Sequence, residues 1–345
     1  MSRKICLAGG GTGGHLVPNL ALYKVLLAKK SCPYFYITNN EFDRRFCSSR
    51  GVEARILKFG KLASGGFFFV VAKVLFSIIE VGLHFLLERP HRVVGSGGYG
   101  SFPMYFCAVL LRIPLFIVEP NHVCGKVNRW FAPYARKIFT VAKNIRGLER
   151  QTNLVVSGNP LPYDLLSNEQ TGSVLLVFGA SQGASVINEF MASWLSESRE
   201  ALPFRIVWIT GSREYLIYKP MQVGDGIEII DFHDNMELLY KQAALVICRA
   251  GAGTVAELKT FRVPAILVPY PHHGDRQQYL NSEDLVSSGA CLMVEEAEFE
   301  IGPIREMVMN LFKSPEALTE MRANFPDSPN PLLVREGIAN IILEN

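Results

Sequence analysis

A glycine-rich turn in the second half of the chain has the residue types that bind a nucleotide diphosphate. The turn, 249–257, follows an apolar, β-prone run over 244–248 and opens a helical pattern. Small residues between a strand and a helix let backbone N–H groups approach an anion, and the helix dipole adds partial positive charge there. Glu257 lies three residues past Thr254, where its carboxylate can accept hydrogen bonds from a sugar diol. An ordinary capped turn with a solvated Glu257 would have the same pattern.

A second polar cluster follows the next predicted strand, 264–269. It contains Asp275, Gln277, Gln278 and Asn281. Because parallel strands bind ligands beyond their carboxyl ends, we expect this cluster to lie beside the glycine-rich turn. An anion-binding turn, a carboxylate and amides that can bind hydroxyl groups together indicate a nucleotide-sugar site.

The beginning of the chain shows a similar strand, glycine turn and helix. Strand 4–8 is followed by Gly9, Gly11 and Gly14, which fit the pattern G-x-G-x-x-G, a weak signal when it stands alone. An NAD-binding unit would also need an acid after its second strand to hold the ribose. That strand ends in two asparagines, which counts against NAD as a cofactor, although Glu41, slightly beyond them, is a candidate for that acid.

Strands and helices alternate along the whole chain, as a parallel sheet requires. Further glycine turns follow strands at 95–100 and 179–183, and the second half repeats the opening pattern from residue 173. We therefore predict an α/β fold with two Rossmann-like, doubly wound domains that face a central cleft. The predicted strands are 4–8, 34–38, 92–94, 115–118, 138–141, 153–156, 173–178, 205–210, 227–230, 244–248 and 264–269. The predicted helices include 16–30, 184–195 and 332–343.

The formal charge is unevenly divided between the two halves. Residues 1–158 hold 22 Lys and Arg against 7 Asp and Glu, whereas 159–345 hold 13 against 25, so the halves carry +15 and −12. The reversal coincides with turn-forming residues at 158–162. We therefore predict an N-terminal domain at 1–158, a C-terminal domain at 159–331 and a closing helix at 332–345. The basic half points to a polyanion or an anionic membrane surface as a partner.

The seven cysteines are scattered and contain no C-x-x-C pair. Such a pattern is typical of a reducing cytosol and not of a disulfide framework or a zinc site. The apolar residues behind Arg3 and Lys4 are soon broken by glycines, so no signal peptide is expected.

Residues 67–87 are the most apolar stretch of the chain. Lys73, Ser77, Glu80 and His84 lie at i, i+4, i+7 and i+11, which places them on one polar stripe of a helix. Ionisable residues inside the segment make a membrane-spanning helix an unfavourable interpretation.

The apolar face of the same segment is too wide for one packing partner. Phe67, Phe68 and Phe69, with Lys58 and Lys61 upstream, have the composition of a segment that enters a bilayer interface. An ordinary core helix would explain the polar stripe equally well.

Five ordered motifs together resemble the MurG family, the N-acetylglucosaminyltransferases that convert lipid I to lipid II in bacterial cell-wall synthesis. The resemblance covers essentially the whole chain. The motifs are 10–15 with Pro18, 97–103, 179–184, 248–257, and 275–278 with Asn281.

The resemblance implies the two-domain glycosyltransferase fold called GT-B and an inverting transfer from UDP-N-acetylglucosamine (UDP-GlcNAc) to the 4-hydroxyl of the N-acetylmuramyl sugar of lipid I. It implies a peripheral location at the cytoplasmic face of the inner membrane, on an anionic surface, with other cell-wall synthesis enzymes as candidate partners and no nucleic acid. No cofactor and no metal are expected, and the chain has no Asp-x-Asp motif. Adjacent His272 and His273 could not easily share one metal ion.

The resemblance also implies roles for individual residues. His15 is the first choice as general base and Glu119 the second. Ser181 and the backbone of 252–254 would hold the diphosphate, Glu257 the ribose, and Gln277 and Gln278 the sugar. The residues implied to bind UDP-GlcNAc are Thr12, Gly13, Gly14, Asn121, Ser181, His233, Ala252, Gly253, Thr254, Val255, Ala256, Glu257, Gln277 and Gln278. Those implied to bind the acceptor pyrophosphate are Gly13, Gly14, Gly97, Gly98 and Tyr99.

Two positions depart from the family pattern. The family commonly has His-Glu-Gln-Asn where this chain has Val-Glu-Pro-Asn at 118–121, so Glu119 and Asn121 are the surviving polar members. It also commonly has an arginine where this chain has Pro162, and Arg249 is a candidate to supply the missing cation.

Two other functions remain open from the sequence. A UDP-GlcNAc 2-epimerase of similar fold would need additional acids around the anomeric carbon and would not require a lipid. A non-catalytic, membrane-associated nucleotide-binding protein would release no UDP in the presence of a lipid acceptor.

Overall fold

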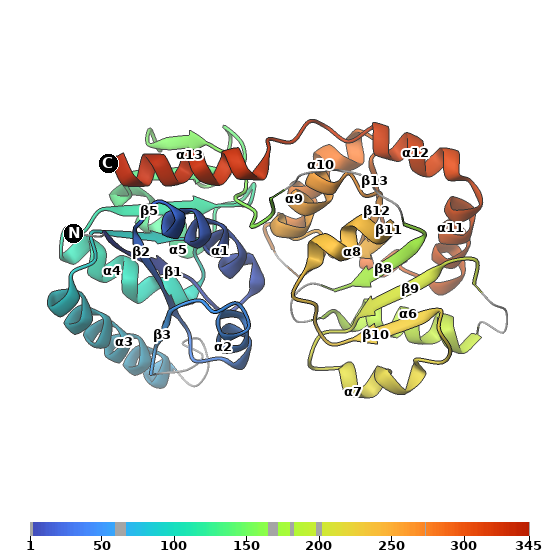
Figure 1. The fold of residues 1–345 in the computed structure, drawn as a ribbon, viewed down its shortest axis with the longest axis horizontal. Coiled ribbons are helices and arrows are strands. Elements are labelled where there is room, and N and C mark those ends of the chain that lie inside the picture. The colour runs from blue at the N-terminus through green and yellow to red at the C-terminus, as the bar shows by residue number, and fades with distance from the viewer. Residues whose placement is uncertain are drawn as a thin grey trace. The chain divides into compact units, whose positions relative to one another are not determined.

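A computed structural model describes residues 3–58, 67–164, 172–179, 183–197, 202–272 and 274–344, with Phe67 described by its backbone only. The chain forms two compact units (Figure 1). Unit 1 comprises Met1–Asp164 and Pro329–Asn345, and unit 2 comprises Leu165–Ser328. The C-terminal helix therefore belongs to the unit that contains the N-terminus.

Unit 1 is built on a parallel sheet of seven strands in the order β3-β2-β1-β4-β5-β6-β7. The order reverses between β1 and β4, so the connections that leave these two strands go to opposite faces of the sheet. Ligands of doubly wound sheets bind at such a switch point, beyond the carboxyl ends of the strands. The strands are β1 (Lys4–Ala8), β2 (Cys32–Ile37), β3 (Ala54–Ile56), β4 (Arg92–Gly95), β5 (Leu115–Glu119), β6 (Lys137–Thr140) and β7 (Leu154–Val156).

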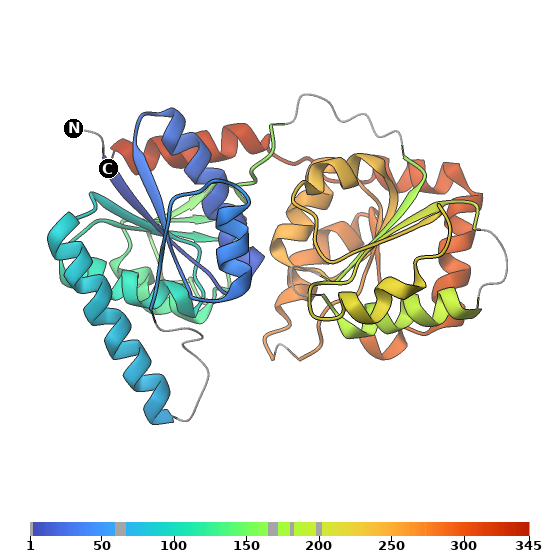
Figure 2. The ribbon, with the colours of Figure 1, turned by 60° about the horizontal axis from the view of Figure 1, so that its bottom comes forward.

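Helices cover both faces of this sheet. One apolar core contains side chains of α1 (Gly13–Ala28), α2 (Glu41–Ser48) and α13 (Pro331–Glu344). The other contains side chains of α3 (Phe67–Glu88), α4 (Phe102–Leu110) and α5 (Lys126–Phe131). Figure 2 shows α13 lying beside α1, and these two helices are in contact.

Unit 2 repeats this plan with a parallel sheet of six strands in the order β10-β9-β8-β11-β12-β13. Its order reverses between β8 and β11, which are central and almost entirely buried. Burial on both faces explains why these two strands read as continuous apolar runs. The strands are β8 (Val174–Phe178), β9 (Arg205–Ile209), β10 (Ile227–Ile230), β11 (Ala243–Cys248), β12 (Ala265–Leu267) and β13 (Cys291–Met293).

The helices of unit 2 flank its sheet, and the described residues of the chain also form four short 3-10 helices. The α-helices are α6 (Ser185–Glu197), α7 (Tyr215–Tyr218), α8 (Met236–Gln242), α9 (Ala252–Phe261), α10 (Gln277–Ser287), α11 (Ile301–Lys313) and α12 (Pro315–Ala323). The 3-10 helices are η1 (Tyr99–Ser101), η2 (Ala132–Tyr134), η3 (Lys219–Met221) and η4 (Glu296–Glu298).

The predicted α/β class with two doubly wound sheets is confirmed, and each predicted strand is present within a few residues of its expected bounds. Two strands of three residues each, β3 and β13, were not predicted. Helix α1 begins at Gly13 and not at residue 16, so two glycines of the first turn belong to the helix.

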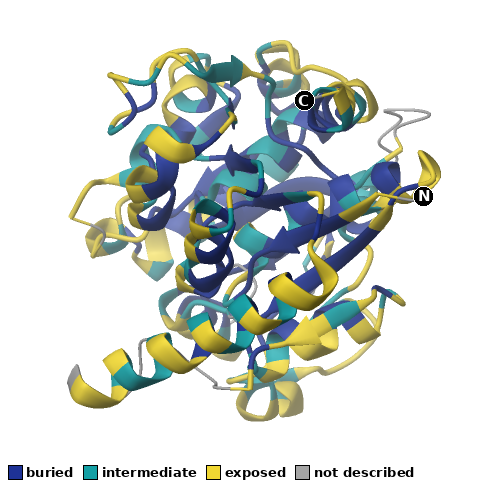
Figure 3. Ribbon diagram, turned by 90° about the vertical axis from the view of Figure 1, so that its left-hand side faces the viewer, coloured by how far each residue is buried: buried dark blue, intermediate teal, exposed yellow. Residues whose placement is uncertain are grey.

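Helix α3 packs Val81 and Phe85 against the sheet together with its polar stripe, and it presents a second apolar face to solvent. Ser77 is fully buried, the Glu80 carboxylate accepts a hydrogen bond from the Lys58 N–H at 3.1 Å, and the His84 ring contacts Tyr34. The exposed residues lie along the length of the helix (Figure 3). The large apolar residues exposed on it are Phe68, Phe69, Val71, Leu75, Phe76, Ile79, Leu83, Leu86 and Leu87.

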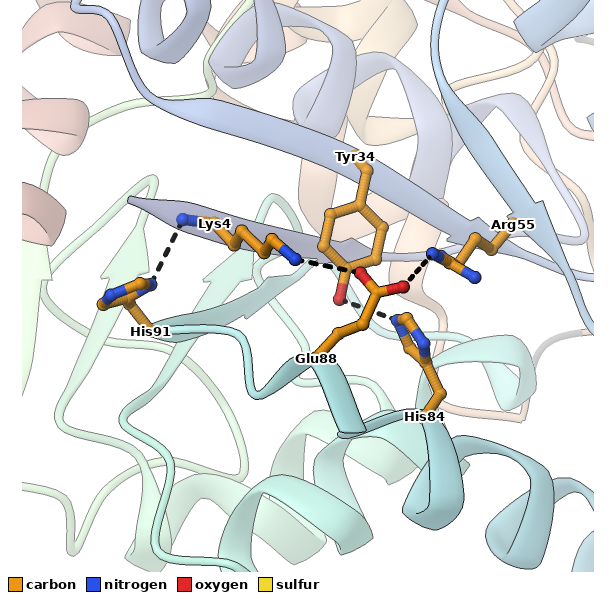
Figure 4. A network of polar contacts seen from close by, with 6 residues as sticks. All are labelled: Lys4, Tyr34, Arg55, His84, Glu88 and His91. Carbon is orange, nitrogen blue, oxygen red and sulfur yellow. Dashed lines mark hydrogen bonds and ion pairs between the residues drawn. The ribbon is translucent and has the colours of Figure 1, made fainter. Parts of the chain in front are cut away.

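A polar network fixes the C-terminal end of α3 to strands β1, β2 and β3 (Figure 4). The Glu88 carboxylate forms ion pairs with Lys4 at 3.1 Å and Arg55 at 2.7 Å, and these cations lower its pKa. The His84 Nε2 lies 3.3 Å from the Tyr34 hydroxyl. Burial and Arg55 lower the pKa of His84, so its ring is neutral at physiological pH.

In the described part of the chain, α3 is the one helix with the length and composition of a membrane span. Its most apolar window has a mean hydropathy of 2.0, and only 17% of that window is buried. A core helix of this composition would be mostly covered, so the polar network holds α3 with its apolar face outward.

Candidate active site

The first glycine loop, 9–14, leaves β1 at the switch point of unit 1. Gly10 and Gly11 have φ values of 143° and 93°, which side-chain-bearing residues rarely adopt. The carboxylate of Asp43, fully buried, accepts the Gly11 N–H at 2.9 Å and the Thr38 N–H at 3.2 Å. Burial raises the pKa of Asp43, while these hydrogen bonds oppose the rise. The loop therefore takes its shape from a carboxylate that the sequence analysis did not identify.

Asp43 did carry one local signal. Asn40 caps α2 by accepting the Asp43 N–H at 2.6 Å, and an Asn followed three residues later by an acid is a helix-start pattern. That pattern predicts the helix, but it gives no indication that the acid reaches back to the first glycine loop.

His15 lies in the first turn of α1 and faces the second glycine loop, 95–100. Its Nδ1 lies 2.9 Å from the Ser96 carbonyl oxygen. A carbonyl oxygen only accepts, so Nδ1 carries the proton and Nε2 of the neutral ring keeps a lone pair. The Nε2 atom has no hydrogen-bond partner among the described residues. The half-buried ring is thus oriented with a free basic nitrogen.

The second glycine loop is shaped to fit His15. A Cβ atom at Gly98 would lie 2.8 Å from His15 Cδ2, and Gly98 has a φ of 78°. Buried Tyr105 fixes the position of this loop. Its hydroxyl accepts a hydrogen bond from the Gly97 N–H at 3.2 Å and donates one to Asn128 Oδ1 at 3.2 Å. Tyr99 follows with 57% of its surface exposed. The structure therefore brings His15, Gly97, Gly98 and Tyr99 together, as the sequence predicts.

Glu119 ends β5 and is 1% exposed. Its Oε1 accepts hydrogen bonds from the Asn121 N–H at 3.1 Å and the Asn121 side chain at 2.9 Å. Its Oε2 accepts from the Gly125 N–H and the Asn128 side chain, both at 2.9 Å. Four donors therefore occupy the carboxylate, which organises the 119–125 loop and the start of α5. A general base needs a free lone pair that faces the substrate, so the geometry favours His15 over Glu119.

The glycine loops of unit 2 leave β8 and β11, the two strands at its switch point. Gly183 has a φ of 82°, and a Cβ atom there would lie 2.2 Å from the Thr210 carbonyl oxygen, so the loop after β8 requires glycine. Ser181 lies outside the described residues. After β11, Gly251 precedes α9 with no side chain capping it, and a Cβ atom at Gly253 would meet nothing within 4 Å. The start of α9 is therefore open to an anion.

Glu257 lies on the second turn of α9 and is 9% exposed. The Tyr240 hydroxyl donates to its Oε2 at 2.9 Å, and the Tyr240 ring stacks on Phe261. Thr254 is half-buried one turn earlier. A carboxylate held in one orientation beside a helix start is suited to a ribose diol, although Tyr240 itself was not predicted.

Arg249 cannot supply the cation missing at Pro162, because protein groups already bind it. Its guanidinium forms an ion pair with Glu296 at 2.6 Å and donates to the carbonyl oxygens of Val268 and Pro269 at 3.1 and 3.2 Å. It is only 6% exposed. The sequence places an arginine beside the phosphate loop, but its partners lie on distant segments that spacing alone does not reveal.

Two other cations contact the segment around Pro162. Lys24 Nζ donates to the Pro162 carbonyl oxygen at 3.3 Å. Arg335 of α13 is 3% exposed and donates to the carbonyl oxygens of Leu161 and Tyr163 at 3.0 and 2.7 Å. Arg335 thus fastens α13 to this segment.

The remaining predicted donor residues lie beyond the carboxyl edge of the second sheet, His233 after β10 and Gln277 and Gln278 at the start of α10. Gln278 Oε1 accepts the Tyr270 N–H at 2.9 Å, which ties the start of α10 to the end of β12. The Gln277 N–H donates to Asp275 at 3.2 Å. His233 follows β10, and its Nδ1 accepts the Asn235 N–H at 3.2 Å. No group of three or more His, Cys, Asp or Glu side chains in the described ranges is arranged to hold a metal ion.

Comparisons with known proteins agree with this geometry. Models of the glycosyltransferase family 28 N-terminal and C-terminal domains match residues 5–140 and 174–335. A Myxococcus xanthus protein named UDP-N-acetylglucosamine--N-acetylmuramyl-(pentapeptide) pyrophosphoryl-undecaprenol N-acetylglucosamine transferase is 32% identical, over 92% of this chain and 87% of that protein.

Solved structures show the same fold. The crystal structure of MurG from Acinetobacter baumannii matches with a TM-score of 0.73 and 24% identity, over 99% of this chain and 100% of that chain. A UDP-GlcNAc 2-epimerase from Neisseria meningitidis matches with a TM-score of 0.70 and 14% identity, over the same shares of the two chains.

Replacement of Glu119 by Gln should destabilise unit 1. A glutamine side chain accepts at only one of its two terminal atoms, so two buried donors lose their acceptor, at a cost of roughly 2–4 kcal/mol. Hydrogen exchange of the β5 amides would measure the loss within unit 1 alone. Glu53→Gln, at an exposed position, is the matched control. Unchanged β5 protection would mean that Glu119 does not organise this loop.

Proposed function

The chain belongs to glycosyltransferase family 28, and on this basis we propose that it transfers N-acetylglucosamine from UDP-GlcNAc to undecaprenyl-pyrophosphoryl-N-acetylmuramyl-pentapeptide. The product of this reaction is the lipid-linked disaccharide used for peptidoglycan. The resemblance to the MurG family that the five motifs indicated is thereby confirmed. The single observation that carries the proposal is that all four glycine-rich loops leave strands at the two switch points.

We assign the acceptor to unit 1. The loops after β1 and β4 present small residues and backbone N–H groups to a pyrophosphate, and His15 lies between them with Nε2 free. His15 Nε2 would accept the proton of the acceptor 4-hydroxyl as that oxygen attacks the anomeric carbon. The attack opposite UDP inverts the configuration at that carbon.

We assign the donor to unit 2. The open start of α9 would bind the diphosphate and stabilise the negative charge that develops on UDP as it leaves. Glu257, oriented by Tyr240, would accept hydrogen bonds from the ribose hydroxyls. Gln277 and Gln278 begin the neighbouring helix α10, where they would bind the sugar hydroxyls.

An epimerase is the second candidate, because solved 2-epimerases share the fold. Identities of that size support the fold alone, whereas the 32% identical relative is named as a transferase. Incubation with radiolabelled UDP-GlcNAc, with and without the lipid acceptor, separates the candidates. Label transfer that requires the acceptor supports the transferase, and conversion of UDP-GlcNAc to its 2-epimer without the acceptor supports an epimerase.

We further propose that unit 1 binds the cytoplasmic surface of the membrane through α3. The exposed apolar residues of α3 lie on one layer with exposed Phe106 and Leu110 of α4 and Trp130 at the end of α5. They belong to the half of the chain that carries +15. Apolar insertion and attraction to anionic headgroups are separate contributions, and this layer has the groups for both.

His15→Ala should lower turnover by about two orders of magnitude or more, because it removes the proton acceptor. UDP binding, measured by calorimetry, should remain normal, since unit 2 supplies that site. His15→Gln is a second variant that keeps a hydrogen-bonding side chain but has no basic nitrogen. Near-normal turnover in both variants would assign the proton transfer to another group.

Glu257→Ala should weaken binding of UDP by roughly 1–3 kcal/mol, the contribution of a hydrogen bond to a charged group. Tyr240→Phe should weaken it less, because it removes only the group that orients the carboxylate. Calorimetric titration with UDP measures both. Loss of stability with unchanged UDP affinity would make Glu257 a structural residue.

Replacing Phe69, Phe76 and Leu83 by Ser should reduce co-sedimentation with anionic vesicles at high salt, where headgroup attraction is screened and apolar insertion remains. Phe67, from the predicted trio, has no described side chain, whereas Phe68 and Phe69 are exposed. The control is Leu216→Ser with Ile217→Ser, two exposed apolar residues on α7 of unit 2. Equal losses in both variants, or none in the first, would argue against α3 as the membrane face.

A further inference from the structure

A cavity of about 320 Å³ opens at the edge of the first sheet opposite the glycine loops. It lies between the C-terminal end of α4 and the amino ends of β5 and β6. Its walls combine two arginines and a tyrosine with apolar side chains. The lining residues that matter here are Val109, Arg112, Ile113, Pro114, Tyr134 and Arg136.

Both arginines are exposed, and within the described ranges neither guanidinium has a hydrogen-bond or ion-pair partner. Unpaired guanidinium groups beside one cavity form a ready site for a phosphate oxygen. Other arginines of this unit, such as Arg55 and Arg335, are bound to protein groups. Arg112 and Arg136 therefore remain available to an external anion.

The surroundings of the cavity indicate which anion it takes. Tyr134, which lines the cavity, is 62% exposed, and Leu110, the last residue of α4 and next in sequence to the lining residue Val109, is 67% exposed. Leu86 and Leu87, in the last turn of the neighbouring helix α3, are 65% and 86% exposed. Because helices that follow parallel strands run back along the sheet, α3 and α4 both end at this edge. A free phosphate would gain nothing from these apolar groups, whereas a lipid would place its phosphate at the arginines and its apolar part against them.

We propose that this cavity binds the phosphate group of an anionic glycerophospholipid, with Arg112 and Arg136 as the phosphate-binding residues. The inference deepens the membrane association proposed above and rests on it. It adds a specific headgroup site to a surface otherwise described only by its apolar residues and overall charge. The site is separate from the loops assigned to substrates, since it lies at the opposite edge of the sheet.

Arg112 permits a variant that removes the charge without disturbing the fold. It has a φ of 54° and ends α4 with the hydrogen bonds Arg112 N–H to the Val109 carbonyl at 3.2 Å and Ile113 N–H to the Ala108 carbonyl at 2.8 Å. Glycine is the preferred residue at this position of a helix end. Arg112→Gly should therefore fold at least as well as the parent, so lost binding cannot be ascribed to unfolding.

The test variant combines Arg112→Gly with Arg136→Gln in the full chain. Its first control combines Lys30→Gly with Lys29→Gln at the end of α1, in the helix layer on the other face of the sheet. Lys30 has a φ of 60° and forms the same type of helix end, with its N–H bonded to the Leu27 carbonyl at 3.0 Å. Each variant thus loses two positive charges and gains one glycine at a left-handed position.

The second control, Lys126→Gln with Arg129→Gln, removes two exposed cations of α5 from the same helix layer as the cavity but outside it. Comparison of this control with the test variant shows whether vesicle binding depends on the two arginines of the cavity or on any two positive charges of this helix layer. Partition is measured by flotation with phosphatidylcholine vesicles that contain one part in three phosphatidylglycerol. No UDP-sugar or acceptor is present, so the result does not depend on transferase activity.

The test variant should lose vesicle affinity by about tenfold or more, because two guanidinium groups lose their charge-assisted hydrogen bonds to the lipid phosphate. Both controls should lose much less. An equal loss in the α5 control would show that binding follows diffuse charge, and parent-like binding by the test variant would remove the arginines from the membrane contact. Either result overturns the proposal.

Inorganic phosphate serves as the competing probe. Stabilisation of the parent by phosphate alone, lost in the test variant while vesicle binding is retained, would identify a free-phosphate site and reject the lipid. Transfer to a detergent-solubilised acceptor should be normal in the test variant. An inactive parent would count against the proposed function without changing the vesicle result, so the two failures are distinguishable.

Discussion

The reversal of strand order at the centre of each parallel sheet is the constraint on which the candidate sites depend. At the reversal, neighbouring connections go to opposite faces, so the carboxyl ends of two strands are left for a ligand. In unit 1 these strands are β1 and β4, and in unit 2 they are β8 and β11. All four glycine-rich loops follow these four strands. The small residues are therefore placed where an anion must approach the backbone, and the larger polar residues lie on loops beside them.

Two buried carboxylates determine which backbone groups remain for a ligand in unit 1. Asp43 accepts the Gly11 N–H, and Glu119 accepts the N–H groups of Asn121 and Gly125. An unpaired charge at such depth would cost several kcal/mol, and saturation with donors offsets that cost. These backbone N–H groups already donate to a carboxylate, so they are not available to a ligand. An anion can bind only the other N–H groups of each loop. His15, held through Nδ1, lies between the two glycine loops of this unit.

The sequence predicts the parts of the site that are local and fails where partners are distant. Strand, glycine turn and helix follow one another within a few residues, so the sequence predicts the glycine loops and the start of α9 from local patterns alone. The role of Asp43 could not, because its loop partner Gly11 lies 32 residues away. Arg249 was misjudged for the same reason, since Glu296 and the end of β12 bind it. Strands β3 and β13 are too short for their pattern to stand out.

The orientation of α3 follows from its polar stripe and carries a cost in water. Val81, Phe85 and Ser77 are buried against the sheet, and Glu80 and Glu88 are paired with Lys58, Lys4 and Arg55, so the remaining apolar face of α3 points outward. Each large apolar side chain left exposed forgoes roughly 1.5–3 kcal/mol of burial. Rotating α3 about its axis would bury these side chains and gain that free energy. It would also expose the residues now in the core and break the polar network. A sequence that retains such an arrangement gains from it only where the exposed face meets another apolar phase. In the membrane association proposed here, a bilayer interface would supply that phase, and the excess of basic residues in this half of the chain would supply the attraction that brings the face to it.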